Sequence, residues 1–308
     1  VSAIVDELHE GVIVADLVRI RAQRINTKFL CYHLNSQLTN DFINSKQKGT
    51  TRPRVQLSVV RELPIYTPAL PEQERIVGIL DEAFDGIAKA KASAEANLQN
   101  ARALFQSHLQ SVFSQKGEGW VEKKLGDIGK VSMCKRIFKE ETTPSGDIPF
   151  YKIGTFGKEP DAFIPIQTYN EYREKYSFPK KGDILISASG TIGRRVRYDG
   201  EPAYFQDSNI VWINNDEKQV LNDYLYHFYG GCNWNSTKGA TISRLYNDNL
   251  RQIALTFPSQ LLEQRRIATQ LDTLTSETQR LESLYQNKLN ALDELKKSLL
   301  HQAFSGNL

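Results

Sequence analysis

The chain has 308 residues, 40% of them hydrophobic and 24% charged, a balance typical of globular proteins that excludes a disordered or fibrous chain. Its formal net charge of +3 is too small to indicate a nucleic-acid partner by itself. No apolar run approaches the roughly 20 residues that span a bilayer, and no signal-peptide pattern is present, so we expect a cytoplasmic protein without a membrane partner. The three cysteines form no C-x-x-C pair, which excludes a zinc ribbon and fits a reducing compartment.

A twelve-residue motif occurs twice in the chain. Residues 70–81 read LPEQERIVGILD and residues 261–272 read LLEQRRIATQLD, with seven identical positions at an offset of 191. The similarity continues to VFS and AFS at residues 112–114 and 303–305. It also extends backward: KGTTRPRVQLSVVRELPIYTP parallels KGATISRLYNDNLRQIALTFP, FLCYHL parallels YLYHFY, and Asp16 aligns with Asp207. The sequence therefore predicts two copies of one unit, and the first copy aligns only from about Ile192 of the second.

Each repeated motif opens a long segment whose apolar residues are spaced mostly by fours and threes. This spacing predicts two long helices that pair as an antiparallel coiled coil, at residues 70–116 and 259–308. Small residues of the first helix stand where the second has large ones, for example Ala94 against Tyr285, which favours packing of one helix on the other. Two ordinary core helices are the alternative, but typical globular helices are about a third of this length.

The segment between the helices has a different pattern. Short β-like runs (IPFYKIG, GDILISAS, RRVRYDG, SNIVWI and IALTF) alternate with Gly, Pro, Asn and Asp, and a helical stretch lies near residues 223–229. The sequence therefore predicts an α+β fold in which residues 117–258 form a complete module of mixed short strands and helices. Residues 1–69 are expected to be the C-terminal part of a first module that lacks its front half.

This order of features resembles the specificity subunit of type I restriction-modification enzymes. The resemblance covers essentially the whole chain and rests on YTPALPEQERIVGILD, FPSQLLEQRRIATQLD, the ISASGTIG loop and the closing LLHQAFSGNL. It implies that each module is a target-recognition domain reading half of a two-part DNA site. The two helices would then form the antiparallel rod that separates the modules, which explains why the motif occurs twice.

The resemblance also implies the partners. Double-stranded DNA would bind the modules, and two methylation subunits and the restriction subunits would dock on the exposed polar faces of the helices. S-adenosylmethionine, ATP and Mg would bind those partner subunits, so we expect no cofactor on this chain and no catalytic activity of its own. Self-association through the helices is consistent with the repeat.

Loops rich in hydroxyl and basic residues are the candidate DNA contacts, because such groups bind phosphates and base edges. The richest is SASGTIGRRVR, and a second, STKGATISR, has a counterpart in the first module, KQKGTTRPR. The candidate DNA-binding residues are Ser187, Ser189, Thr191, Arg194, Arg195, Arg197, Lys238, Thr241, Ser243, Arg244, Lys48, Thr50, Arg52 and Arg54. The alternative for the first loop is a β-turn with solvated arginines. For Gln206, Asp207, Ser208 and Asn209 we favour a structural role.

Two other function classes remain open. A purely structural coiled-coil adaptor would fit the modest net charge. A nuclease using Glu140, Glu141 and Asp147 is less favoured, because neighbouring acids in a loop are usually solvated. The sequence has no phosphate-binding loop, and its five histidines lack metal-ligand spacing, so it predicts a protein without catalytic or metal residues.

Overall fold

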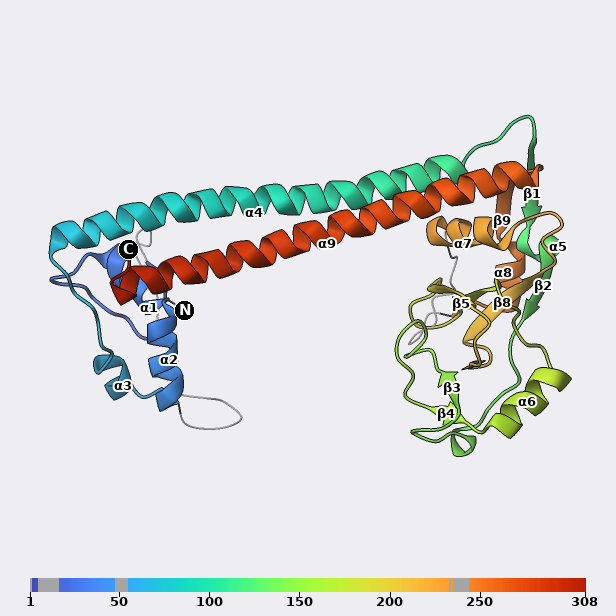
Figure 1. Ribbon diagram of the computed structural model, residues 1–308, viewed down its shortest axis with the longest axis horizontal. Helices are drawn as coiled ribbons and strands as arrows, with labels where there is room; N and C mark the ends of the chain where they lie inside the picture. Colours follow the sequence, from blue (N-terminus) through green and yellow to red (C-terminus); the bar gives the residue numbers. More distant parts are fainter. Residues whose placement is uncertain (1, 5–16, 48–54, 233, 235–243) are drawn as a thin grey trace. The chain divides into compact units, whose positions relative to one another are not determined.

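The computed structural model describes residues 2–4, 17–47, 55–232, 234 and 244–308 (Figure 1). The chain forms two compact units, one comprising Val1–Ala101 and Arg280–Leu308, the other Arg102–Gln279. We call them unit 1 and unit 2. Each contains one module and the adjoining ends of the two long helices.

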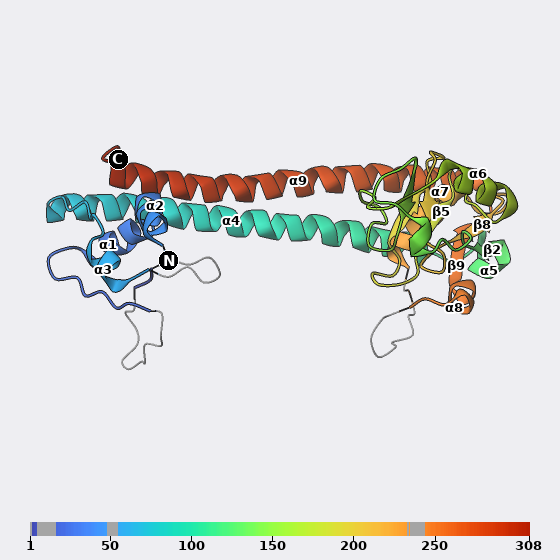
Figure 2. The ribbon, with the colours of Figure 1, turned by 90° about the horizontal axis from the view of Figure 1, so that it is seen from below.

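The long helices are α4 (Leu70–Phe113) and α9 (Leu261–Ser305). They run side by side in both views (Figures 1 and 2). Within unit 1, Lys91 Nζ lies 2.7 Å from Asp293 Oδ1, and Lys296 Nζ lies 4.9 Å from the ring centroid of Phe84. Residue numbers thus rise along α4 as they fall along α9, and the predicted antiparallel pair is confirmed. The observed helices start and stop within three residues of the predicted segments.

In the described part of the unit 1 module, residues 2–4, 17–47 and 55–69, helices are the only regular elements, and irregular segments connect them. Its elements are α1 (Thr27–Leu34), α2 (Gln37–Lys46) and α3 (Leu57–Arg61). Phe29 of α1 is fully buried against the start of α4 and the end of α9, in a cluster with Ile76, Leu80, Leu300, Ala303 and Phe304. The helices of unit 1 therefore share one core with the ends of the long pair.

Unit 2 carries the strands and the predicted mixed fold. Its helical elements are α5 (Leu125–Ile128), the 3-10 turn η1 (Lys139–Glu141), α6 (Ile166–Lys175), α7 (Asn222–Gly231) and α8 (Asn247–Gln252). Its strands are β1 (Trp120–Lys124), β2 (Gly129–Ser132), β3 (Ile148–Tyr151), β4 (Phe163–Ile164), β5 (Ile184–Ser187), β6 (Arg195–Arg197), β7 (Tyr204–Phe205), β8 (Ile210–Asn215) and β9 (Ala254–Pro258). All five predicted β-like runs contain a strand, and the predicted helix near residue 223 is α7.

Three small sheets organise these strands. The largest has the order β2-β8-β5-β6 with antiparallel neighbours, and the others are β4-β3-β7 and β1-β9. One apolar cluster joins the large sheet and α7 to the end of α4 and the start of α9, through Leu109, Val112, Ile267 and Leu271. A second cluster fills the space around β3, β7 and the other face of the sheet. The long helices are therefore part of the unit 2 core as well.

The repeated glutamine has the same structural role in both units. Gln73 and Gln264 are 2% and 0% exposed. Each donates a 2.7 Å hydrogen bond to the proline carbonyl just before its long helix, Pro68 or Pro258. The side-chain oxygen of each glutamine also accepts a hydrogen bond from the backbone N–H of the N-cap residue of a module helix. This residue is Asn26 for α1, at 2.8 Å, and Leu221 for α7, at 2.9 Å. The glutamine of the EQ-x-R-I motif thus joins the helix to its module.

Two further contacts occur at equivalent positions of the two repeated units. Asp81 accepts hydrogen bonds from Tyr32 and Lys28 of α1, and its counterpart Asp272 bonds to His227 of α7, which aligns with Tyr32. At the far ends, the ring of Phe304 lies 5.2 Å from Phe29, and that of Phe113 lies 5.2 Å from Tyr224. The end of each long helix therefore packs on the module in which the other helix begins.

Candidate nucleic-acid interface

The strand register places several loops of unit 2 at one end of the large sheet. Ser132 of β2 lies beside Trp212 of β8, and Ser187 of β5 lies opposite Ile210 of β8. Because neighbouring strands are antiparallel, the loop after β2, the loop after β5 and the turn before β8 emerge together. We call residues 133–138, 188–194, 206–209 and Arg244 the loop cluster. Loops held by a rigid sheet are well placed to bind a ligand.

The ISASGTIG loop is closed by its own first serine. Ser187 is 1% exposed, and its hydroxyl donates to the Thr191 carbonyl at 2.6 Å and accepts from the Arg194 amide at 2.9 Å. Gly190 and Gly193 have φ values of +66° and +83°, which favour glycine, and a Cβ at Gly193 would overlap the indole of Trp234. Ser187 therefore shapes the loop from within, and Thr191 lies exposed at its tip.

The loop is also tied to the rest of the cluster. Ser189, 8% exposed, donates to Asn209 Oδ1 at 2.8 Å and forms an isolated β-bridge with Arg244. The Leu245 amide donates to the Ala188 carbonyl at 2.8 Å. Arg244 of the second predicted loop is thus brought beside the first. The predicted residues Lys238, Thr241, Ser243, Lys48, Thr50, Arg52 and Arg54 lie outside the described residues.

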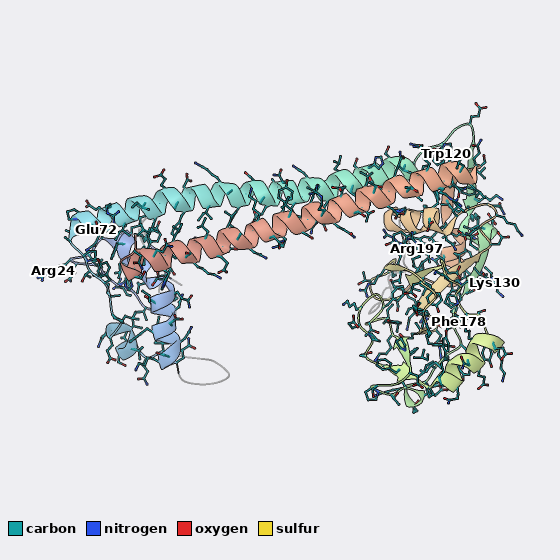
Figure 3. The ribbon with its side chains drawn as sticks, in the orientation of Figure 1. Arg24, Glu72, Trp120, Lys130, Phe178 and Arg197 are labelled. Atoms are coloured by element: carbon teal, nitrogen blue, oxygen red, sulfur yellow. The ribbon has the colours of Figure 1, made fainter. Side chains whose placement is uncertain are left out.

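The three predicted arginines that follow the loop are separated by the strand. Arg194 ends the loop, and its Nη1 donates to the Phe156 carbonyl at 2.9 Å. Arg195 and Arg197 share one face of β6, where their guanidinium groups lie 4.5 and 4.8 Å from the ring centroid of Tyr226 on α7. Arg197 also pairs with Asp223 at 3.0 Å, and Figure 3 shows the labelled Arg197 next to α7. Alternation along a strand thus directs Arg195 and Arg197 toward α7, apart from the loop cluster.

The α7 helix continues this network to the long helix. His227 Nε2 lies 2.9 Å from Asp272 Oδ1 of α9. Burial lowers the pKa of His227, and the nearby Arg195 and Arg197 act in the same direction, while Asp272 opposes them. Burial also lowers the pKa of the Arg195 guanidinium. A neutral His227 that donates to the Asp272 carboxylate fits these surroundings, so the cluster of β6, α7 and α9 is a structural connection.

Two basic residues that the sequence analysis missed lie in the loop cluster. Lys135 and Arg136 follow β2 and are exposed. Arg136 Nε and Nη2 each lie 2.8 Å from Asp207 Oδ2. Gln206 and Asn209 have the structural roles favoured for them, because Gln206 Oε1 accepts from the Ile153 amide at 3.0 Å and Asn209 accepts from Ser189. The weak sequence signal that could have found them is a pair of adjacent basic residues between the apolar Cys134 and Ile137 in KVSMCKRIF.

Two of the three acids considered for a nuclease, Glu141 and Asp147, have local structural roles. Glu141 Oε2 accepts from the Phe138 amide at 2.7 Å and caps η1, and Asp147 Oδ2 accepts from the Ile166 amide at 3.3 Å at the start of α6. Within the part of the chain that the structure describes, His, Cys, Asp and Glu form no group of three or more that could hold a metal ion. A search of the same residues finds no helix long and apolar enough to cross a membrane.

Comparison with known proteins gives one consistent family. The model of the type I restriction modification DNA specificity domain matches residues 12–97 and 117–291. A Haemophilus influenzae protein whose name assigns it as a type I restriction enzyme specificity subunit is 46% identical, over 82% of this chain and 66% of its own. The chain spans about two thirds of the length of the curated relatives it matches, among them proteins of Mycoplasma pneumoniae and Salmonella potsdam.

Two solved structures share the fold. One, from a study of complex assembly and conformational transition in a type I restriction-modification system, has a TM-score of 0.78 and 22% identity over 94% of this chain and 74% of that chain. The other is the HsdS subunit from Thermoanaerobacter tengcongensis, with a TM-score of 0.55 and 20% identity over 91% of this chain and 70% of that chain. Both comparisons show that the chain shares the fold of these proteins.

Proposed function

This chain belongs to the family of the type I restriction modification DNA specificity domain, and we propose that it recognises the DNA sequence on which a restriction-modification complex acts. Unit 2 would read one part of the site through the loop cluster. The observation that carries this proposal is the convergence of three loops and Arg244 at one end of a rigid sheet.

The chemistry of the loop cluster supports DNA as the ligand. Lys135, Arg194 and Arg244 bring positive charge, and Thr191 and Gly190 of the same cluster are exposed. Cationic groups bind phosphates, while hydroxyls and backbone amides fix the position of the DNA backbone. Ser187 and Ser189 would act indirectly, by holding the loop. Lys238, Thr241 and Ser243, and in unit 1 Lys48, Thr50, Arg52 and Arg54, would extend the contacts to the DNA backbone.

The catalytic steps would then belong to partner subunits. We propose that methylation subunits, which use S-adenosylmethionine, and restriction subunits, which use ATP and Mg, assemble with this chain, and that it binds none of these cofactors itself. The structural connection from β6 through α7 to Asp272 of α9 fits such a role, since it fixes the reading module to the long helix.

Salt-dependent DNA binding tests the loop cluster. We expect Lys135→Ala, Lys238→Ala and Arg244→Ala together to weaken binding and to lower the slope of log affinity against log salt by up to roughly 3, since each lost phosphate contact lowers it by about 0.9. The measurement is a salt titration of duplex binding by the full chain with its methylation subunit, followed by fluorescence anisotropy.

The opposite end of the same sheet provides the control. Lys180, Lys181 and Lys218 lie there and are exposed, so their replacement by alanine removes the same charge at a distance from the loop cluster. Equal losses from both triple variants would assign binding to net charge and would contradict the loop cluster as the interface. An assembly of the unchanged chain that binds no DNA would favour the structural adaptor.

A further inference from the structure

The loop that carries Arg136 is firmly anchored on both sides. Cys134 and Ile137 are buried, at 3% and 8% exposure. The hydroxyl of the buried Tyr204 donates to the Lys135 carbonyl at 2.9 Å. The backbone at Arg136 is therefore fixed by the core, while its side chain extends from the surface with 58% exposure.

The carboxylate that holds Arg136 is itself fixed. Asp207 is only 14% exposed and lies in a short turn where the Asn209 amide donates to the Asp207 carbonyl at 2.7 Å. Ser208, which adopts a φ of +60°, donates to Asp207 Oδ2 at 3.3 Å. The Gln206 amide donates to the Tyr151 carbonyl at 3.0 Å, which ties the turn to β3. An exposed guanidinium is thus oriented by a largely buried acid on a rigid turn.

This pairing leaves one edge of the guanidinium available. Asp207 occupies the edge formed by Nε and Nη2. Among the described residues, no other hydrogen bond or ion pair to Arg136 is found, so the edge formed by Nη1 and Nη2 faces solvent. Two parallel N–H donors on that edge match a ligand with two neighbouring acceptors. In duplex DNA the N7 and O6 atoms of guanine form such an edge in the major groove.

A base edge fits this arrangement better than a phosphate. The Asp207 charge cancels the Arg136 charge, so the pair has little attraction for an anion, and the carboxylate repels one. The N–H donors of Arg136 keep their direction. Because Asp207 already holds the Arg136 side chain in the free protein, little further side-chain entropy is lost when Arg136 binds a base. An oriented guanidinium whose charge is balanced by Asp207 therefore contributes to discrimination between bases more than to overall affinity.

We propose that Arg136 reads a guanine in the part of the DNA site bound by unit 2, and that Asp207 is its positioning residue. The proposal rests on the proposed function and adds a residue that determines specificity. Arg136 would contact the base directly, whereas Asp207 would act only by orienting Arg136.

The test is competition binding by the full chain with its methylation subunit, against duplexes in which each base pair of the recognised site is changed in turn. We expect Arg136→Ala and Arg136→Lys to lose about 10-fold to 100-fold of discrimination at one G·C pair and to keep it elsewhere. Lysine retains the charge but lacks the two-donor fork. Asp207→Asn should reduce discrimination at the same pair while binding to non-specific duplex stays equal or becomes tighter, because one negative charge is lost.

Several results would overturn the proposal. A uniform loss of affinity over all duplexes, with a salt slope lower by about 1, would make Arg136 a phosphate contact. Unchanged discrimination would leave the Arg136–Asp207 pair as a surface ion pair only. Lys181→Ala controls for the loss of one charge, and tryptophan fluorescence verifies folding of each variant. An unchanged chain that binds DNA without sequence preference would refute the proposed function itself, which the Arg136 variants alone cannot do.

Discussion

Replacing Gln264 with methionine is expected to lower the free energy of unfolding of unit 2 by about 3 kcal/mol, because unpaired buried polar groups each cost about 1–3 kcal/mol. The side chain is fully buried, and its amide bonds to the Leu221 amide and to the carbonyls of Gln219 and Pro258. Methionine has a similar volume but offers none of these partners, so a cavity would not explain the loss. Urea unfolding followed by tryptophan fluorescence measures the effect, since all three tryptophans of the chain lie in unit 2.

The same helix supplies the control for this experiment. Gln270 lies on the exposed face of α9, where it accepts only a surface hydrogen bond from Arg266. Gln270→Met should change the unfolding free energy by less than about 0.5 kcal/mol. Similar losses from both substitutions would show that Gln264 does not join helix and module as described. The equivalent change in unit 1, Gln73→Met, should leave the tryptophan signal of unit 2 unchanged.

Replacing Phe304 with alanine is expected to destabilise unit 1 by about 3–5 kcal/mol, the usual cost of truncating a buried phenylalanine. Phe304 is 5% exposed and packs on the rings of Phe29 and His33 at 5.2 and 4.8 Å. Its loss opens a cavity where α9 ends on α1. Hydrogen exchange of the α1 amides should rise by two orders of magnitude or more, since about 1.4 kcal/mol corresponds to a factor of ten.

The equivalent phenylalanine of the other long helix provides the matched comparison for Phe304→Ala. Phe113, its counterpart at the end of α4, is only partly buried, so Phe113→Ala should cost less and should act on unit 2. Fast exchange of α1 in the Phe113 variant, or protected α1 amides in the Phe304 variant, would contradict the crossed packing of helix ends on modules.

Sequence periodicity was sufficient for the elements that depend on local patterns. The antiparallel helix pair follows from apolar spacing and a repeated motif, and β3, β5, β6, β8 and β9 follow from short β-like runs, whereas β1, β2, β4 and β7 were not predicted. Side-chain direction was harder to predict. A run of arginines after the ISASGTIG loop suggests one basic patch, but the start of β6 directs Arg195 and Arg197 toward Tyr226. Because β6 begins at Arg195, only Arg194 remains with the loop.

Long-range pairs could not be read from one sequence. Arg136 and Asp207 are 71 residues apart and meet only because β2 and β8 are neighbours in the sheet. Likewise, the EQ-x-R-I motif shows that Gln73 and Gln264 recur, but the hydrogen bonds that explain the repeat reach back to Asn26 and Leu221. The sequence also does not distinguish a serine whose hydroxyl forms an internal hydrogen bond, as that of Ser187 does, from a serine that contacts a ligand.

A genome-wide map of methylated adenines, in cells that receive this chain together with its cognate methylation subunit, tests whether the chain recognises DNA sequence. We expect new methylation confined to one defined sequence motif, part of which changes when the loop cluster of unit 2 is altered. No new methylation, or new methylation that follows no motif, would contradict the claim that this chain recognises DNA sequence.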